Sequence, residues 1–92
     1  MLNVKILDAG MSYTEEDGYV GKVQFEVEGD SGGYEITLQS KRGKDWGYGL
    51  FFLKDSGDEE KLLALEERLE EDDELFDYLV ETAKAELPER KD

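Results

Sequence analysis

The chain has 92 residues, of which 25 are acidic and 11 are basic, so its formal net charge is −14. It contains no cysteine and no histidine. Their absence excludes disulfides, zinc centres built on thiolate or imidazole ligands, and the familiar histidine-dependent catalytic triads.

Length and hydropathy indicate one domain over residues 1–88, followed by a frayed tail at 89–92. The longest apolar run, at residues 50–53, is far too short to cross a bilayer. The N-terminus lacks the basic start and apolar core of a secretion signal. We therefore expect a cytoplasmic protein with no membrane contact, no catalytic activity, no metal and no cofactor.

The first half of the chain alternates between apolar and polar residues, which predicts strands with one buried and one solvated face. Three such strands are expected around residues 2–6, 22–28 and 34–39. A fourth strand is expected at about 47–54. Together the four strands are expected to form one sheet over about residues 1–54.

The links between these strands are short. Residues 29–33 are rich in glycine and predict a hairpin, and residues 41–45 predict a second turn. Residues 11–18 are interpreted as a polar connection between the first two strands. Four strands in sequence with short links favour an antiparallel meander.

The fourth strand departs from the alternating pattern because it is apolar on both faces. Tyr48, Leu50 and Phe52 share one phase, whereas Phe51 and Leu53 share the other. A strand of this kind is either buried on both faces or provides a contact surface.

The second half has the period of helices. Ser56 and Glu59 fit a capping box that begins a helix over about residues 58–70. Asp72 or Asp73 suits the N-cap of a second helix over about 74–87. The alternative is one helix of about 45 Å that dimerises, but a domain of this size is only about 30 Å across.

The sequence therefore predicts a two-layer α+β fold, in which two C-terminal helices pack on one face of a four-stranded antiparallel meander. The apolar residues that share a phase within these elements are expected to form one core. They are Leu2, Val4, Ile6, Val23, Phe25, Val27, Ile36, Leu38, Leu50, Phe52, Leu62, Leu65, Leu69, Phe76, Val80 and Ala83.

The other face of the sheet is the first candidate for a binding surface. We expect it to present Phe51 and Leu53, with Leu7 and Trp46 nearby, to a protein partner or to a second copy of the chain. The basic residues next to this strand would orient the partner, and they are Lys41, Arg42 and Lys44. The alternative is that the C-terminal tail or residues 11–18 cover the patch.

The acidic residues are the second candidate. Residues 58–92 carry a net charge of −10, against −4 for residues 1–57. The carboxylates at helical spacing are Glu66, Glu67, Glu70, Glu71, Asp73, Glu74 and Asp77. They predict either a face that binds a basic protein, a solvated face that only confers solubility, or a mimic of nucleic acid that inhibits a DNA- or RNA-binding protein.

A third alternative concerns RNA. Residues 44–51 resemble in part the aromatic strand of RNA-recognition domains, because Lys44, Gly47 and Phe51 match that pattern. Asp45 and Gly49 do not match, and the negative charge repels phosphates. The expected function is thus a non-catalytic acidic protein-interaction module, with nucleic acid not expected as a partner.

Overall fold

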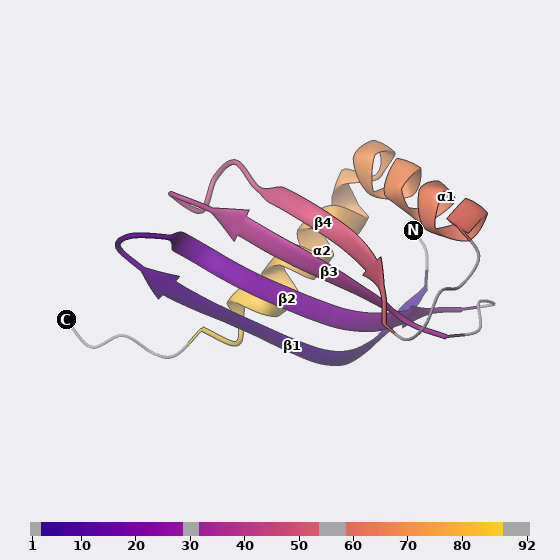
Figure 1. Cartoon of the computed structure of the whole chain (residues 1–92), viewed down its shortest axis with the longest axis horizontal. Helices are drawn as coiled ribbons and strands as arrows, with labels where there is room; N and C mark the ends of the chain where they lie inside the picture. Colours follow the sequence, from indigo (N-terminus) through magenta and orange to yellow (C-terminus); the bar gives the residue numbers. More distant parts are fainter. Residues whose placement is uncertain (1–2, 29–31, 54–58, 88–92) are drawn as a thin grey trace.

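The structure is a computed structural model that describes residues 3–28, 32–53 and 59–87. Its four strands and two helices follow one another along the chain (Figure 1). They are β1 (Val4–Thr14), β2 (Gly18–Val27), β3 (Tyr34–Ser40), β4 (Gly47–Phe52), α1 (Glu59–Glu71) and α2 (Asp73–Lys84). Every strand is antiparallel to its neighbours in the order β1-β2-β3-β4. The predicted α+β meander is confirmed.

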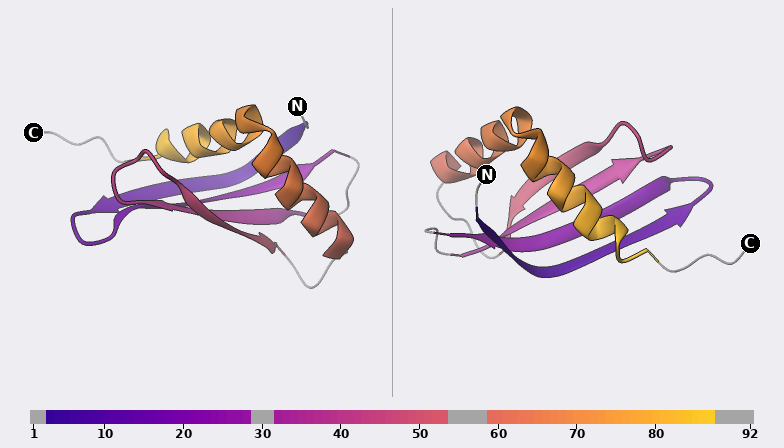
Figure 2. Two further views of the ribbon diagram at one scale, coloured as in Figure 1. Left: turned by 90° about the horizontal axis from the view of Figure 1, so that it is seen from above. Right: turned by 180° about the vertical axis from the view of Figure 1, so that it is seen from behind.

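The molecule has two layers, with both helices on the same face of the sheet (Figure 2). α2 packs against β1 and β2, and α1 packs beside β4. We call the helix-covered face of the sheet the inner face and the opposite one the outer face. Within the described residues, no helix lies on the outer face (Figure 1).

The core lies between the inner face and the helices. Most of the predicted core residues are buried or pack against buried ones. Leu2 lies outside the described residues. The prediction missed four residues that are buried, and they are Met11, Tyr34, Leu75 and Leu79.

Met11 was missed because it was assigned to the predicted polar connection at 11–18, and a β-bulge at Leu7 turns it towards the helices. Ile6 pairs with Phe25 and Asp8 pairs with Gln24, so Leu7 is an extra residue opposite β2. Because side chains alternate with a period of two, one extra residue reverses which side chains face the helices. Met11 is therefore buried, although the run up to Leu7 predicts that odd positions face solvent.

The predicted polar connection at 11–18 is wrong. β1 continues to Thr14 and β2 begins at Gly18, so only residues 15–17 form the turn. The backbone N–H of Asp17 donates to Oγ1 of Thr14 over 3.0 Å, which stabilises this tight turn. Residues 11–14 are paired in the sheet and do not cover the outer face.

The two helices are separate, as predicted, although their bounds differ. α1 ends at Glu71 and α2 ends at Lys84, three residues before the predicted end. Asp72 is the N-cap of α2, with an extended backbone and a carboxylate that accepts from Leu75 N–H over 3.2 Å. Its carboxylate also lies 3.6 Å from Nε of Arg68. The predicted cap at Ser56 lies outside the described residues.

Replacing Asp72 with alanine tests its role at the boundary between α1 and α2. The change removes the N-cap and the contact with Arg68, so we expect a loss of about 1 kcal/mol in the free energy of unfolding. Urea denaturation followed by circular dichroism measures it. Asp73→Ala is the matched control, because Asp73 is exposed and lies one residue inside the helix. Equal effects of the two changes would contradict the role of Asp72.

Candidate functional site

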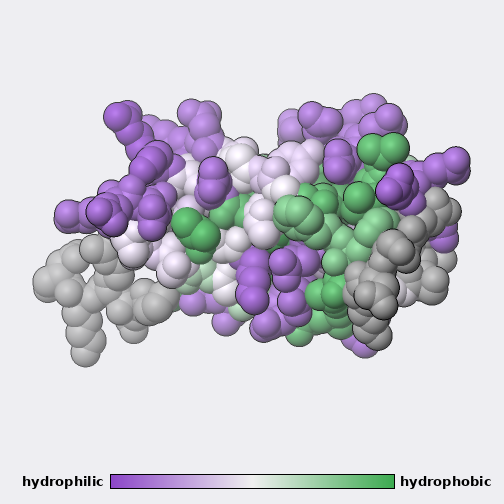
Figure 3. Space-filling view, in the orientation of Figure 1, coloured by the Kyte–Doolittle hydropathy of each residue, from purple (hydrophilic) through white to green (hydrophobic). Residues whose placement is uncertain are grey.

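The outer face is polar at its centre and apolar at one edge. The register places Asp8, Gln24, Glu35 and Phe51 in one row across the four strands. Nε2 of Gln24 donates to Oε1 of Glu35 over 3.0 Å, so the two polar side chains in the middle of the row are hydrogen-bonded to each other. Phe51 ends the row on edge strand β4 and is 52% exposed. Figure 3 shows the apolar area, which lies towards the C-terminal end of β4.

Phe51 and Leu53 lie over glycines. A methyl group on Gly49 would be 3.0 Å from Cε2 of Phe51, and one on Gly33 would be 3.0 Å from Cδ2 of Leu53. The Leu53 N–H donates to the Gly33 carbonyl over 3.0 Å, which holds the end of β4 against the chain before β3. Because Gly49 and Gly33 have no side chain, Phe51 and Leu53 can lie close to the sheet.

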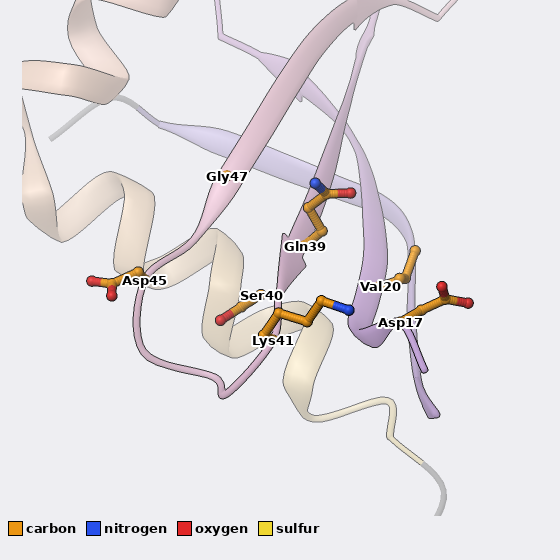
Figure 4. Close-up of a pocket in the computed structure, with 7 residues that line it drawn as sticks. All are labelled: Asp17, Val20, Gln39, Ser40, Lys41, Asp45 and Gly47. Atoms are coloured by element: carbon orange, nitrogen blue, oxygen red, sulfur yellow. The ribbon is translucent and has the colours of Figure 1, made fainter. Parts of the chain in front are cut away.

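Two adjoining hollows open on the same face, towards the N-terminal end of β4. One of about 280 Å³ is lined by Val20, Thr37, Leu38, Gln39, Gly47, Tyr48 and Gly49. The other, of about 450 Å³, is lined by Asp17, Val20, Gln39, Ser40, Lys41, Asp45 and Gly47 (Figure 4). Gly47 and Gly49 are the outward positions of β4 here and carry no side chain, so backbone is exposed between Val20 and Phe51.

The basic turn lies at the other end of β4 from Phe51. Nζ of Lys41 donates to the backbone carbonyl of Glu16, and Figure 4 shows its side chain extending towards the turn at Asp17. Lys41 therefore ties two turns together. Arg42 and Lys44 are exposed. Gly47 is four residues from Phe51, about 13 Å along a strand, so the basic turn borders the hollows and not the apolar edge.

Two predicted members of the apolar patch lie elsewhere. Trp46 packs against the core, and its ring centroid is 6.0 Å from that of Tyr19. Leu7 is 43% exposed, but it lies on β1, three strand spacings or about 14 Å from β4. The structure therefore brings together only Phe51 and Leu53 of the four residues. The prediction missed Val20, which is 45% exposed and lines both hollows.

The acidic candidates lie on the helical layer. Glu67, Glu70, Glu71, Asp73, Glu74 and Asp77 are exposed, and Glu66 is half-buried. Residues 59–87 contain 12 acidic and 3 basic residues, whereas the described residues of 3–53 contain 8 and 5. The negative charge is thus concentrated on one layer. The two helices run in different directions (Figure 2), so these carboxylates are not aligned along one axis.

Tyr48 connects this acidic layer to the sheet. It faces the helices, and its ring centroid is 5.5 Å from that of Phe76 in α2. Burial raises the pKa of the Tyr48 phenol above its ordinary value of 10.0, and the charges of Glu70 and Glu66 raise it further. Tyr48 therefore keeps its proton in the folded protein at a pH where it would lose it in the unfolded chain.

This raised pKa predicts a loss of stability in alkali. The contribution of Tyr48 is fully present below the unfolded pKa of 10.0 and falls as pH rises through the folded pKa. Tyr48→Phe removes the ionisation, so the melting temperature of the variant should fall less than that of the wild type between about pH 9 and 11. Tyr78→Phe is the control, because Tyr78 is 40% exposed. Parallel curves for Tyr48→Phe and wild type would contradict the prediction.

The described residues contain no group of three or more acidic side chains arranged to hold a metal ion. None of their buried side-chain nitrogen or oxygen atoms lacks a hydrogen-bond partner. No helix in the described part of the chain is long and apolar enough to cross a membrane. Comparison with known proteins finds no matching family model, no matching curated protein and no matching solved structure.

Proposed function

We propose that this protein is a non-catalytic interaction module that binds another protein chain through the outer face of its sheet. One observation carries the proposal: Phe51 is half exposed, with its ring over Gly49, on a face that no described helix covers. A large aromatic side chain next to exposed backbone and surrounded by polar groups is typical of the anchor of a protein interface.

The chemistry of the face supports binding over catalysis. The chain has no histidine or cysteine to act as base or nucleophile at neutral pH. The residues around the hollows provide one amine, two carboxylates, an amide and three hydroxyls, together with Val20, Leu38 and two glycines. These groups suit recognition of a polypeptide, which offers both apolar side chains and backbone hydrogen bonds. We propose that this binding takes place in the cytoplasm.

The helical layer favours a second candidate function, the binding of a basic protein. The observation behind it is the concentration of 12 acidic against 3 basic residues in 59–87. Such a surface attracts cationic proteins and accelerates their association. One partner of this class would be a DNA- or RNA-binding protein. The helix carboxylates would then occupy its nucleic-acid site in place of phosphates. RNA itself is not proposed, because β4 presents only Phe51 to the open face, while Tyr48 and Trp46 pack with inner-face residues.

Photo-crosslinking tests the outer face. A benzophenone amino acid is placed at Phe51 and, as a matched control, at Leu63, which is 59% exposed on α1. We expect position 51 to form an adduct with another protein chain, in the purified protein or in extract of the source cell. Leu53→Ser should weaken that adduct, and position 63 should not form it. Adducts from position 51 only to its own chain would show that the face is covered internally and would overturn the proposal.

A salt-step elution tests the helical layer. Immobilised wild type and a Glu67→Gln, Glu71→Gln, Glu74→Gln variant are loaded with extract and eluted with rising salt. We expect the bound basic protein to leave the variant at lower salt, because fewer charges attract it. A control with Glu26→Gln and Glu35→Gln changes charges on the sheet. Unchanged elution from the helix variant would exclude this layer as the binding surface.

A further inference from the structure

We infer that the partner is an extended polypeptide segment with lysine or arginine side chains, which joins the sheet as an additional strand beside β4. This inference deepens the proposed function and rests on it, because the outward side chains of the added strand would lie next to Phe51. A strand at this position contacts the outer face with one set of its side chains and the helical layer with the other.

The backbone of β4 has hydrogen-bonding groups that face away from the sheet. β4 is an edge strand, with β3 on one side only. The Leu53 N–H donates to the Gly33 carbonyl, and in an antiparallel ladder such pairs recur at every second residue. Gly49 and Phe51 therefore bond to β3, whereas the N–H and C=O groups of the residues that alternate with them point to the open edge. Those residues are Tyr48, Leu50 and Phe52. No backbone hydrogen bond from another described segment reaches them.

β4 also lacks the features that usually protect the edge of a sheet. At the opposite edge, β1 carries Lys5 and Asp8, and the bulge at Leu7 interrupts its pairing. β4 contains no charged residue and no proline, and its six residues pair with β3 without a shift in register. A flat apolar edge is a template for another strand. Of the two edges, β4 is therefore the one suited to strand addition.

The helix beside this edge is negatively charged. α1 packs beside β4 and, in the view of Figure 1, extends past this edge of the sheet. Glu66 and Glu70 are one turn apart on the flank of α1 that faces β4, because their charges act on the phenol of Tyr48. Within the described residues, neither carboxylate forms an ion pair. Two neighbouring carboxylates without a cation favour a lysine or arginine side chain on the added strand.

The same charges disfavour a second copy of this protein at the edge. Antiparallel pairing of β4 with β4 of another molecule would continue the sheet across the contact and place both α1 helices on one side of it. Glu66 and Glu70 would then approach the same carboxylates of the other copy, and like charges repel. A basic segment has the opposite charge, so the electrostatics select a different chain.

The alternation of side chains predicts a pattern in the partner. Neighbouring strands lie about 4.8 Å apart, so the added strand lies close to α1 on its inner side. A residue opposite Leu50 points to that side, towards Glu66 and Glu70. Residues opposite Gly49 and Phe51 point to the outer face. Basic residues are therefore expected at alternate positions, with apolar residues between them that cover Phe51.

Amide hydrogen exchange followed by NMR tests the edge with two synthetic peptides. The first alternates lysine and valine over about seven residues, and the second has the same sequence with every backbone nitrogen methylated. Methylation keeps the charge and removes the N–H donors. In the free protein, β3 should protect the amides of Gly49 and Phe51, whereas those of Tyr48, Leu50 and Phe52 should exchange faster.

We expect the first peptide to slow exchange of the three edge amides about tenfold or more, with a dissociation constant below about 1 mM, and the methylated peptide to leave them unchanged. Equal protection by both peptides would overturn strand addition, and so would the absence of protection at about 2 mM of the first. Protection that is already present in the free protein would overturn the inference as well. The edge would then be closed by its own chain or, if dilution removes the protection, by a second copy.

Charge variants test the position of the cation. Glu66→Gln combined with Glu70→Gln should weaken binding of the lysine–valine peptide about fivefold, because the carboxylates beside the edge are lost. Glu67→Gln combined with Glu71→Gln is the matched control, because it removes the same charge from exposed positions one residue further round α1. It should change the dissociation constant less than about twofold. Equal effects of the two variants would overturn the placement of the cation between α1 and β4.

The proposed function is judged separately, by the benzophenone at Phe51. If it crosslinks to another protein while the lysine–valine peptide leaves the edge amides unprotected, the outer face is a protein-binding surface and only the added strand is refuted. If position 51 crosslinks only to its own chain, the proposed function fails as well.

Discussion

Phe25→Ala is expected to lower the free energy of unfolding by about 3–5 kcal/mol, which is enough to unfold a domain of this size. Phe25 has no exposed surface and is paired with Ile6 on one side and Tyr34 on the other. Its ring centroid lies 5.9 Å from that of Tyr34. Truncation therefore leaves a cavity in the middle of the sheet, between two strands that cannot close around it without breaking their pairing.

Chemical denaturation measures this loss. Val20→Ala is the matched control on the same strand, because Val20 is 45% exposed on the outer face. It should change the free energy of unfolding by less than about 0.5 kcal/mol. A Phe25→Ala protein with the denaturation midpoint of the wild type would contradict the position of Phe25 in the core.

Gly18→Ala is expected to have the second-largest effect, a loss of about 2–4 kcal/mol from backbone strain and overpacking together. Gly18 has a φ of +76°, which disfavours any residue with a Cβ. A Cβ there would also lie 2.6 Å from the Ser40 carbonyl oxygen and 2.7 Å from Cα of Lys41. Both contacts are with backbone, so neither can be relieved by a rotamer change.

Two other glycines separate the strain from the clash. Gly32 has a φ of +82° with nothing near its Cβ position, so Gly32→Ala should show strain alone, about 1 kcal/mol. Gly10 has neither a positive φ nor a close neighbour, so Gly10→Ala should be near neutral. Melting temperatures of the three variants give the order. A Gly18→Ala effect no larger than that of Gly32→Ala would show that β3 moves away from the turn.

Local sequence patterns were sufficient to predict the fold class and the faces of most elements. Leu50 and Phe51 were predicted to face opposite sides, and they are respectively buried and exposed. The break between the helices at Asp72 followed from its capping chemistry and from the length of a continuous helix. Such features depend on the order of neighbouring residues alone, because strand and helix periods are properties of the local backbone.

The sequence also contained a signal for the hollows, because Gly47 and Gly49 share the phase of Phe51. Gly47 and Gly49 alternate with Tyr48 and Leu50, so a strand with one face lacking side chains was readable in β4. Whether that face opens to solvent depends on which layer covers it. The position of the helices decides this, and α1 and α2 both pack on the other face.

Only the tertiary structure decided which distant residues share a surface. The bulge at Leu7 reversed the alternation of β1, buried Met11 and left Leu7 on the edge opposite Phe51. Trp46 packs against the core, beside Tyr19. Both outcomes depend on contacts between segments that are distant in the sequence. A local period does not show where a bulge adds a residue, and that extra residue exchanges the two faces for the rest of the strand.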